Sequence, residues 1–216
     1  MTDTIYALST SQGRAGIAVV RISGPDAFLS LRSMSKDIQI KPRKTILCDL
    51  FTKEGLHLDR ALVISFKGPN SFTGEDVVEL HIHGSIAVIQ KTLETLSKIS
   101  NFRQALPGEF TRRAFLNEKL NLAEIEGLAD LIEAETEAQR VQALKVLSGK
   151  LGERAKEWRS MIIKAMALIE VTIDFADEEV PTDVSKDVKY ILTNIINDLD
   201  KESKSINVAE RIRTGF

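Results

Sequence analysis

The spacing of apolar positions divides the chain into a region of short strands and a region of long helices. Up to about residue 118 the apolar runs are short, rich in β-branched residues and bounded by turn-forming residues, which is typical of strands. Two stretches repeat apolar positions every three or four residues and predict helices, the first capped by Ser23 or Asp26. We expect strands at about 4–9, 17–23, 45–51, 60–66, 77–82 and 101–105, and helices at about 26–35 and 85–99.

From residue 119 onward nearly every apolar position has helical spacing. The pattern predicts three helices, at about 122–148, 152–175 and 185–210, and Asn121 with Glu124 forms a capping-box pattern at the first start. A turn at Pro107-Gly108 and a two-turn helix at about 110–116 join the two regions. We therefore expect an α+β domain at 1–118, followed by an all-α helical bundle segment at 119–216.

The three long helices carry wide apolar stripes, which a small bundle would leave partly uncovered. We therefore expect the chain to be a fragment of a longer protein.

Composition narrows the class of protein. The 216 residues are 43% hydrophobic and 28% charged, which is typical of a globular protein. The net charge of −2 argues against a protein that coats nucleic acid by bulk electrostatics and leaves room for a local basic patch. Cys48 is the single cysteine and lies in an apolar run, so we expect a small core residue and no disulfide. No apolar run approaches membrane-spanning length and the start does not resemble a signal peptide, so we expect a cytoplasmic protein.

Two glycine-containing stretches superficially resemble phosphate-binding loops, and both fail. The stretch 13–16 lacks the second glycine of the dinucleotide pattern, and a strand follows it. After Gly149-Lys150, Leu151 stands where a magnesium-binding Ser or Thr is needed. We therefore predict no catalytic residues for nucleotide hydrolysis in this segment.

Two groups of residues are candidates for metal binding. Glu79, His81 and His83 alternate along one strand, so they share a face and could chelate zinc; a half-exposed polar face is the simpler interpretation. The acidic stretch 174–181 could also bind a metal, although a solvated loop stopped by Pro181 fits it better. We predict no metal site.

Arg21 is unusual because it lies in an otherwise apolar strand. An arginine in such a position needs a fixed anionic partner, since burying its charge unpaired is costly. Glu79, on another predicted strand, is the candidate. The pair could be a structural ion pair, or the two groups could clamp a carboxylate or polar heterocycle.

Three blocks together resemble the MnmE (TrmE) family of tRNA-modification GTPases. They are GRAGIAVVRISGPDA (13–27), PNSFTGEDVVELHIHGS (69–85) and RQALPGEFTRRAFLNEKLNLAEIEGLADLIEAET (103–136). The resemblance covers the family's N-terminal domain and the first part of its helical domain. It implies that the first domain has an α+β fold similar to the folate-binding domain of aminomethyltransferases. It also implies that this first domain forms a homodimer.

The resemblance also implies a ligand and partners. Its folate contacts fall on Arg21, Glu79 and Lys119, with 5,10-methylenetetrahydrofolate as the one-carbon donor and 5-formyltetrahydrofolate as its stable analogue. Arg112, Arg113 and Asn117 would line the same cleft or the dimer interface. With the FAD-containing partner MnmG, as a heterotetramer, the family modifies C5 of the wobble uridine of tRNA with an aminomethyl or carboxymethylaminomethyl group.

In the family, a GTPase domain that uses magnesium and potassium is inserted after a point near residue 216. We expect the present residues alone to be inactive in GTP hydrolysis. Two alternatives stay open: a metal-dependent hydrolase using Glu79, His81 and His83, or a purely structural dimerisation module. The sequence departs from the family pattern at Ser85, Glu118 and Asn121, where glycine, glycine and aspartate are usual.

Overall fold

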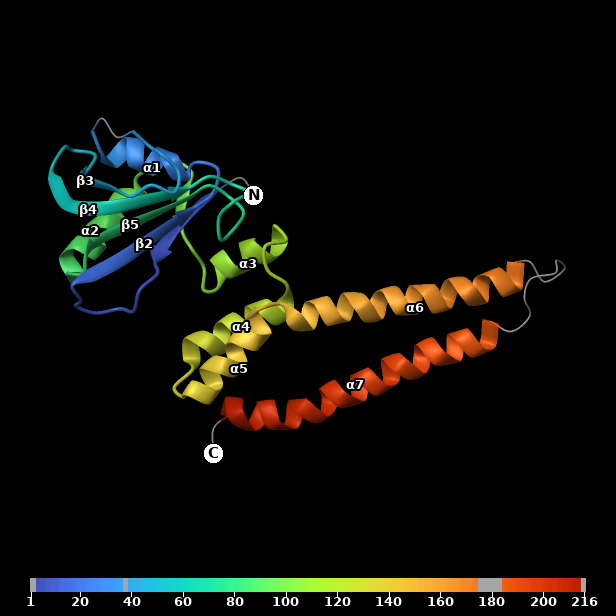
Figure 1. Ribbon diagram of the computed structural model, residues 1–216. Helices are drawn as coiled ribbons and strands as arrows, with labels where there is room; N and C mark the ends of the chain where they lie inside the picture. Colours follow the sequence, from blue (N-terminus) through green and yellow to red (C-terminus); the bar gives the residue numbers. More distant parts are fainter. Residues whose placement is uncertain (1–2, 37–38, 175–183, 215–216) are drawn as a thin grey trace. The chain divides into compact units, whose positions relative to one another are not determined.

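The computed structural model describes the backbone of residues 3–36, 39–174 and 184–214, and side chains as far as residue 203. The chain forms two compact units, Met1–Leu120 and Asn121–Phe216 (Figure 1). The first combines a sheet with helices and the second is helical, so the predicted succession of an α+β domain and an all-α segment is confirmed.

A six-stranded sheet forms the frame of the first unit, with the strand order β3-β4-β5-β2-β1-β6. The strands are β1 (Thr4–Leu8), β2 (Ile17–Ser23), β3 (Ile46–Phe51), β4 (His57–Phe66), β5 (Val77–His83) and β6 (Phe102–Gln104). Neighbouring strands are antiparallel except β1 and β6, which run parallel. All six predicted strands are therefore present, although β4 begins earlier than expected.

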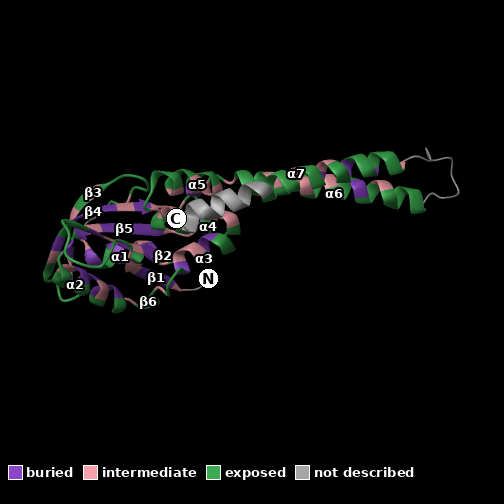
Figure 2. Cartoon of the chain, turned by 90° about the horizontal axis from the view of Figure 1, so that it is seen from below, coloured by how far each residue is buried: buried purple, intermediate pink, exposed green. Residues whose placement is uncertain are grey.

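One face of this sheet packs against helices α1 (Ala27–Met34) and α2 (Ile86–Ser97). Because side chains alternate along a strand, Ala18, Val20 and Ile22 of β2 all enter this core, and buried residues line the strands in Figure 2. The intervening residues of β2 point to the opposite face. The candidate residue Arg21 is thus placed on the face that α1 and α2 do not cover.

The starts of the two helices differ in how they are capped. The hydroxyl of Ser85 accepts a hydrogen bond from the backbone N–H of Val88 (3.1 Å), so this departure from the family pattern serves as the N-cap of α2. For α1 the predicted N-cap position is confirmed at Asp26, but the expected side-chain capping bond is not formed. The carboxylate of Asp26 instead accepts from Asn101 (2.9 Å). The hydroxyl of Ser23 is engaged elsewhere, as described below.

The second unit contains α4 (Leu122–Glu133), α5 (Glu137–Leu147), α6 (Lys150–Asp174) and α7 (Val184–Thr214). The predicted capping box of Asn121 and Glu124 is confirmed at the start of α4. The prediction of one helix over 122–148 is wrong. The backbone becomes extended at Ala134, and Thr136 with Gln139 forms a second capping box that starts α5.

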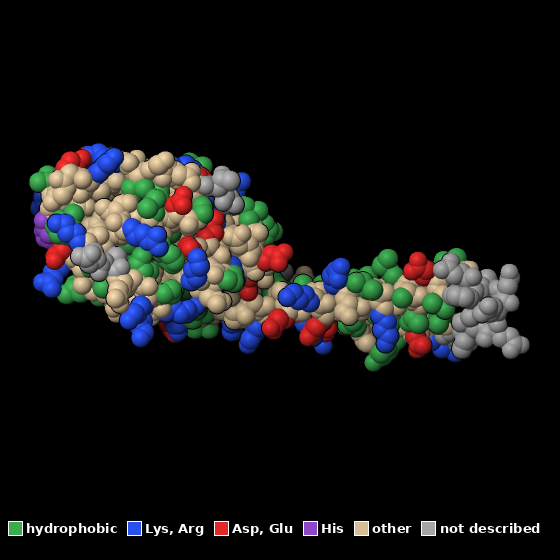
Figure 3. Space-filling view, turned by 90° about the horizontal axis from the view of Figure 1, so that it is seen from above, with side chains coloured by type: hydrophobic (Ala, Val, Ile, Leu, Met, Phe, Trp, Pro, Cys, Tyr) green, Lys and Arg blue, Asp and Glu red, His purple; other side chains and the backbone are tan. Residues whose placement is uncertain are grey.

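The break lets α5 fold back against α4, and the two helices approach closely at Gly127. A Cβ atom at Gly127 would lie 2.6 Å from the backbone nitrogen of Leu147, closer than two such atoms can come. The long helices α6 and α7 pack through a small core around Ala165, Val188 and Ile191. Figure 3 shows hydrophobic side chains exposed along this pair of helices.

Candidate functional site

Arg21 and Glu79 lie directly opposite each other in the register of β2 and β5. The Nε–H of Arg21 donates to Oε1 of Glu79 across 2.8 Å, so the predicted partnership is confirmed. The side chains are 29% and 18% exposed, which leaves the pair within reach of a ligand from the open face of the sheet. Glu79 accepts this one hydrogen bond and has a second oxygen, Oε2, 3.7 Å from Nε2 of His81.

Two aromatic rings flank the Arg21 guanidinium. Its Cζ atom lies over the ring of Phe72 at 5.3 Å from the centroid and over the ring of Phe110 at 5.9 Å. Phe72 belongs to the loop between β4 and β5, and Phe110 to the first turn of helix α3 (Glu109–Leu116). Both distances are within the range of cation–π attraction, which holds the guanidinium in place.

Lys119, the third predicted folate residue, lies just beyond α3, where its backbone N–H donates to Ala114 (2.8 Å). Its aliphatic stem passes over Gly74, since a Cβ atom at Gly74 would be 3.1 Å from Lys119 Cε. No contact joins Lys119 directly to Arg21 or Glu79. The two parts of the candidate site instead meet the same loop, Arg21 at Phe72 and Lys119 at Gly74.

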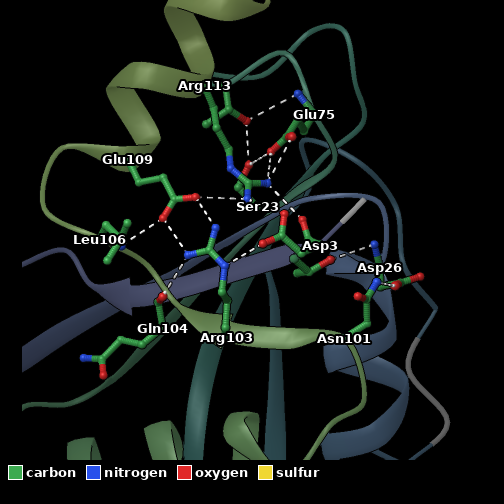
Figure 4. A network of polar contacts seen from close by, with 12 residues as sticks. Asp3, Ser23, Asp26, Glu75, Asn101, Arg103, Gln104, Leu106, Glu109 and Arg113 are labelled. Atoms are coloured by element: carbon green, nitrogen blue, oxygen red, sulfur yellow. Dashed lines mark hydrogen bonds and ion pairs between the residues drawn. The ribbon is translucent and has the colours of Figure 1, made fainter. Parts of the chain in front are cut away.

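The loop and α3 are joined by a network of charged side chains, in which Arg113 and Glu109 are buried and Arg103 is exposed (Figure 4). Arg113 of α3 is fully buried and donates to both carboxylate oxygens of Glu75 (3.1 Å each), to Asp3 and to Glu109. Arg103 donates to both Glu109 and Asp3. Two arginines thus face three carboxylates. The prediction that Arg113 lines a cleft is wrong, because its guanidinium is enclosed by these partners.

The loop is further tied to β2. The hydroxyl of Ser23 donates to Glu75 (2.7 Å) and is 2.6 Å from the hydroxyl of Thr73. Asn117, which follows α3, donates to the backbone carbonyl of Thr73 (2.6 Å). Asn117 therefore holds the loop against the end of α3, and Arg112 of the same helix is exposed.

The network changes the acidity of its carboxyl groups. The hydrogen bond from Arg103 holds the pKa of Glu109 at about 2, well below its usual 4.5, with further help from the backbone of Leu106 and from Arg113. For Asp3, partial burial raises the pKa, but the hydrogen bond from Arg103 and the charge of Arg113 outweigh it and the net pKa is lowered. Both carboxylates are therefore ionised at neutral pH.

Glu79, His81 and His83, the candidate metal ligands, do not converge on one point. Glu79 is paired with Arg21, while the Nδ1 atom of His83 is 2.7 Å from Oδ1 of the buried Asp59. Among the described residues, no group of three or more metal-ligating side chains could hold an ion. The arrangement that a metal-dependent hydrolase requires is thus not found in the described part of the chain. Residues 175–181 of the predicted acidic loop lie outside it.

Two other features are structural rather than chemical. Cys48 packs against the core of the first unit, and burial raises the pKa of its thiol, which keeps it protonated and unreactive. A hollow of about 570 Å³ between α6 and α7 is lined largely by aliphatic side chains such as Ile169 and Leu192.

Among the described helices, none combines the length and apolar character that a membrane span requires.

The fold and the site define a chain with an α+β domain, whose open sheet face presents an arginine–carboxylate pair between aromatic rings, joined to a helical domain. The sequence model described as "GTP-binding protein TrmE N-terminus" matches residues 4–119. The model described as "MnmE helical domain" matches residues 122–216. The chain belongs to the MnmE (TrmE) family.

Curated relatives agree with this assignment. The tRNA modification GTPase MnmE of Roseobacter denitrificans is 53% identical over 214 residues, which are 99% of this chain and 50% of that protein. The proteins of the same name from Ruegeria sp. and Parvibaculum lavamentivorans are each 51% identical, again over 99% of this chain and about half of their own length. The chain spans about half the length of the curated relatives it matches.

Proposed function

We propose that this chain is the folate-binding, dimer-forming N-terminal half of a tRNA-modification GTPase. In the complete protein it acts with MnmG to modify C5 of the wobble uridine of tRNA, with GTP, magnesium and potassium handled by the domain that follows. The observation that carries the folate assignment is the Arg21–Glu79 pair, because it presents ligand-ready polar groups on an uncovered sheet face.

The polar groups at the site suit a reduced folate. Arg21 uses only Nε to bind Glu79, and its two terminal nitrogens have no acceptor among the described residues. Those N–H groups can donate to a ring carbonyl, while the second oxygen of Glu79 can accept from a ring N–H. When bound, 5,10-methylenetetrahydrofolate would supply the one-carbon unit, and 5-formyltetrahydrofolate is its stable analogue.

Lys119 supplies the third expected contact. Its ammonium group has no ion-pair partner among the described residues, and its stem is positioned by Gly74 beside the same loop that carries Phe72. A free ammonium at the edge of the site can attract the carboxylates of a folate tail. Glu118, the neighbouring residue, is exposed, and its carboxylate would repel the carboxylates of the folate tail and weaken the attraction to Lys119 slightly.

The homodimer is proposed on the same face of the sheet. The register aligns Val19, His81, Leu62 and Leu47 across β2, β5, β4 and β3, so these side chains form one row opposite the core. Leu62 and Leu47 are 40% and 57% exposed. Aliphatic side chains on an uncovered sheet face favour burial against a second copy of the chain.

The direct test is a calorimetric titration with 5-formyltetrahydrofolate. The wild-type chain should bind, and Arg21→Ala should weaken binding at least about tenfold, because it removes charge-assisted hydrogen bonds. Arg32→Ala is the matched control, since Arg32 is an exposed arginine on α1, which packs on the other face of the sheet. A folded wild-type chain that fails to bind would contradict the folate assignment and favour a purely structural dimerisation module.

A further inference from the structure

The guanidinium of Arg21 lies close to two aromatic rings. Phe72 and Phe110 come from separate segments, the β4–β5 loop and α3, yet each places its ring face within 6.0 Å of the same Cζ atom. Both rings are only partly buried. Rings that served only to fill the core would be buried among apolar side chains, whereas these two stand beside an accessible polar pair.

The two segments that carry these rings are joined to each other by hydrogen bonds from Arg113 and Asn117. Arg113, fully buried, binds Glu75 in the loop that carries Phe72 and Glu109 directly before Phe110 (Figure 4). Arg113 therefore helps to set the separation of the two segments, together with Asn117, which donates to the backbone of Thr73 in the same loop. A spacing held by buried charge-assisted bonds is rigid, and rigidity in the absence of ligand is what a binding site gains from its supporting residues.

The polar edge between the rings defines what they could enclose. The terminal N–H groups of Arg21 have no acceptor among the described residues, and Oε2 of Glu79, the oxygen that Arg21 does not use, lies 3.7 Å from Nε2 of His81. A ring that pairs with a guanidinium through hydrogen bonds lies close to the guanidinium plane. Phe72 and Phe110, whose ring centroids lie 5.3 and 5.9 Å from Cζ of Arg21, are therefore near enough to contact a flat ligand that pairs with it.

We propose that Phe72 and Phe110 are ligand-contacting residues that pack on the faces of a heterocycle while Arg21 and Glu79 pair with its edge. The ligand class is a flat ring with a carbonyl beside an N–H, which is the chemistry of the 2-amino-4-oxopyrimidine ring of a pterin. This inference rests on the proposed folate function. Phe72 and Phe110 would thus contribute to the affinity for folate, in addition to the charged residues of the site.

The experiment is calorimetric titration of the whole chain with 5-formyltetrahydrofolate for wild type, Phe72→Leu, Phe110→Leu and Phe115→Leu. Phe115 is the matched control because it lies on α3 with Phe110 and is 40% exposed, with no contact to Arg21. Loss of one aromatic face should raise Kd about 2- to 10-fold for each of the first two variants, and Phe115→Leu should leave it unchanged. Phe110→Tyr, which keeps the ring, should bind within about 2-fold of wild type.

The outcomes separate this inference from the function on which it rests. If wild type binds and Phe72→Leu and Phe110→Leu bind as tightly as Phe115→Leu, the aromatic assignment is overturned and the folate function stands. If the folded wild-type chain does not bind, both are overturned. Circular dichroism and thermal melting identify any variant whose weaker binding arises from unfolding. In that case Phe110→Tyr decides whether the ring matters for binding. A folded Phe110→Tyr variant that loses affinity also overturns the aromatic role.

Discussion

Replacing Glu109 by Gln should remove a large, pH-dependent contribution to the stability of the α+β unit. Glu109 is 7% exposed and its pKa is held at about 2 rather than 4.5, so the folded state binds its proton more weakly than the unfolded state. A depressed pKa contributes stability above the unfolded value and loses it as pH falls towards the folded value. The difference corresponds to about 3 kcal/mol at pH 7.

The loss with acid can be worked out step by step. Between pH 7 and pH 5 the contribution of Glu109 should be nearly constant, because the carboxyl is ionised in both states. About 1 kcal/mol of it should be lost by pH 4 and about 2 kcal/mol by pH 3. Glu109→Gln should therefore be much less stable than wild type at neutral pH, and the two should converge as the solution is acidified.

Urea denaturation followed by circular dichroism at several pH values from 7 to 3 measures this directly. Glu94→Gln is the matched control, since Glu94 is a half-exposed carboxylate of α2 in the same unit, paired with Lys91 and Lys98 at the surface. It should leave the stability close to that of wild type. Parallel pH profiles for wild type and Glu109→Gln would refute the reasoning, because they would mean that the carboxyl titrates alike in the folded and unfolded chains.

Two further predictions concern the backbone. Gly127→Ala should destabilise the helical unit by about 2 kcal/mol or more, because the new Cβ would lie 2.6 Å from Leu147 N and force α4 and α5 apart. Thermal melting measures this change, and a variant as stable as wild type would disprove the close approach. Glu118→Gly should stabilise the first unit by up to about 1 kcal/mol, since Glu118 has a φ of 55° that glycine adopts without strain. Urea denaturation measures the change, and a less stable variant would contradict the predicted relief of strain.

The sequence predicts the strands of the sheet and the Arg21–Glu79 pair of the candidate site for clear physical reasons. Strands such as Ile17–Ser23 are apolar on both faces, so a charged residue within one stands out and requires a partner. That argument led from Arg21 to Glu79, and the register of β2 and β5 confirms it. The direct contact could be expected from residue types alone, although the register itself could not be derived from either strand separately.

What could not be predicted depends on contacts between distant segments. The apolar spacing of 122–148 continues through Ala134, so it favours one helix, and only the Thr136–Gln139 pair signals the break. Arg113 lies in a charge-rich stretch that resembles a solvated surface. Its burial depends on Asp3, Glu75 and Glu109 meeting around it, and no local pattern indicates that meeting.

The parallel pairing of β1 with β6 has a consequence for how the protein is made. Arg113 binds Asp3 across 110 positions of sequence, and β1 pairs with β6, whose residues are synthesised almost as late. On the ribosome, β1 and β2 can pair early as a hairpin, but the outer edge of β1 must wait until most of the unit has left the exit tunnel. Closure of the first unit is therefore a late, long-range step, and during synthesis the outer edge of β1 stays unpaired until β6 emerges.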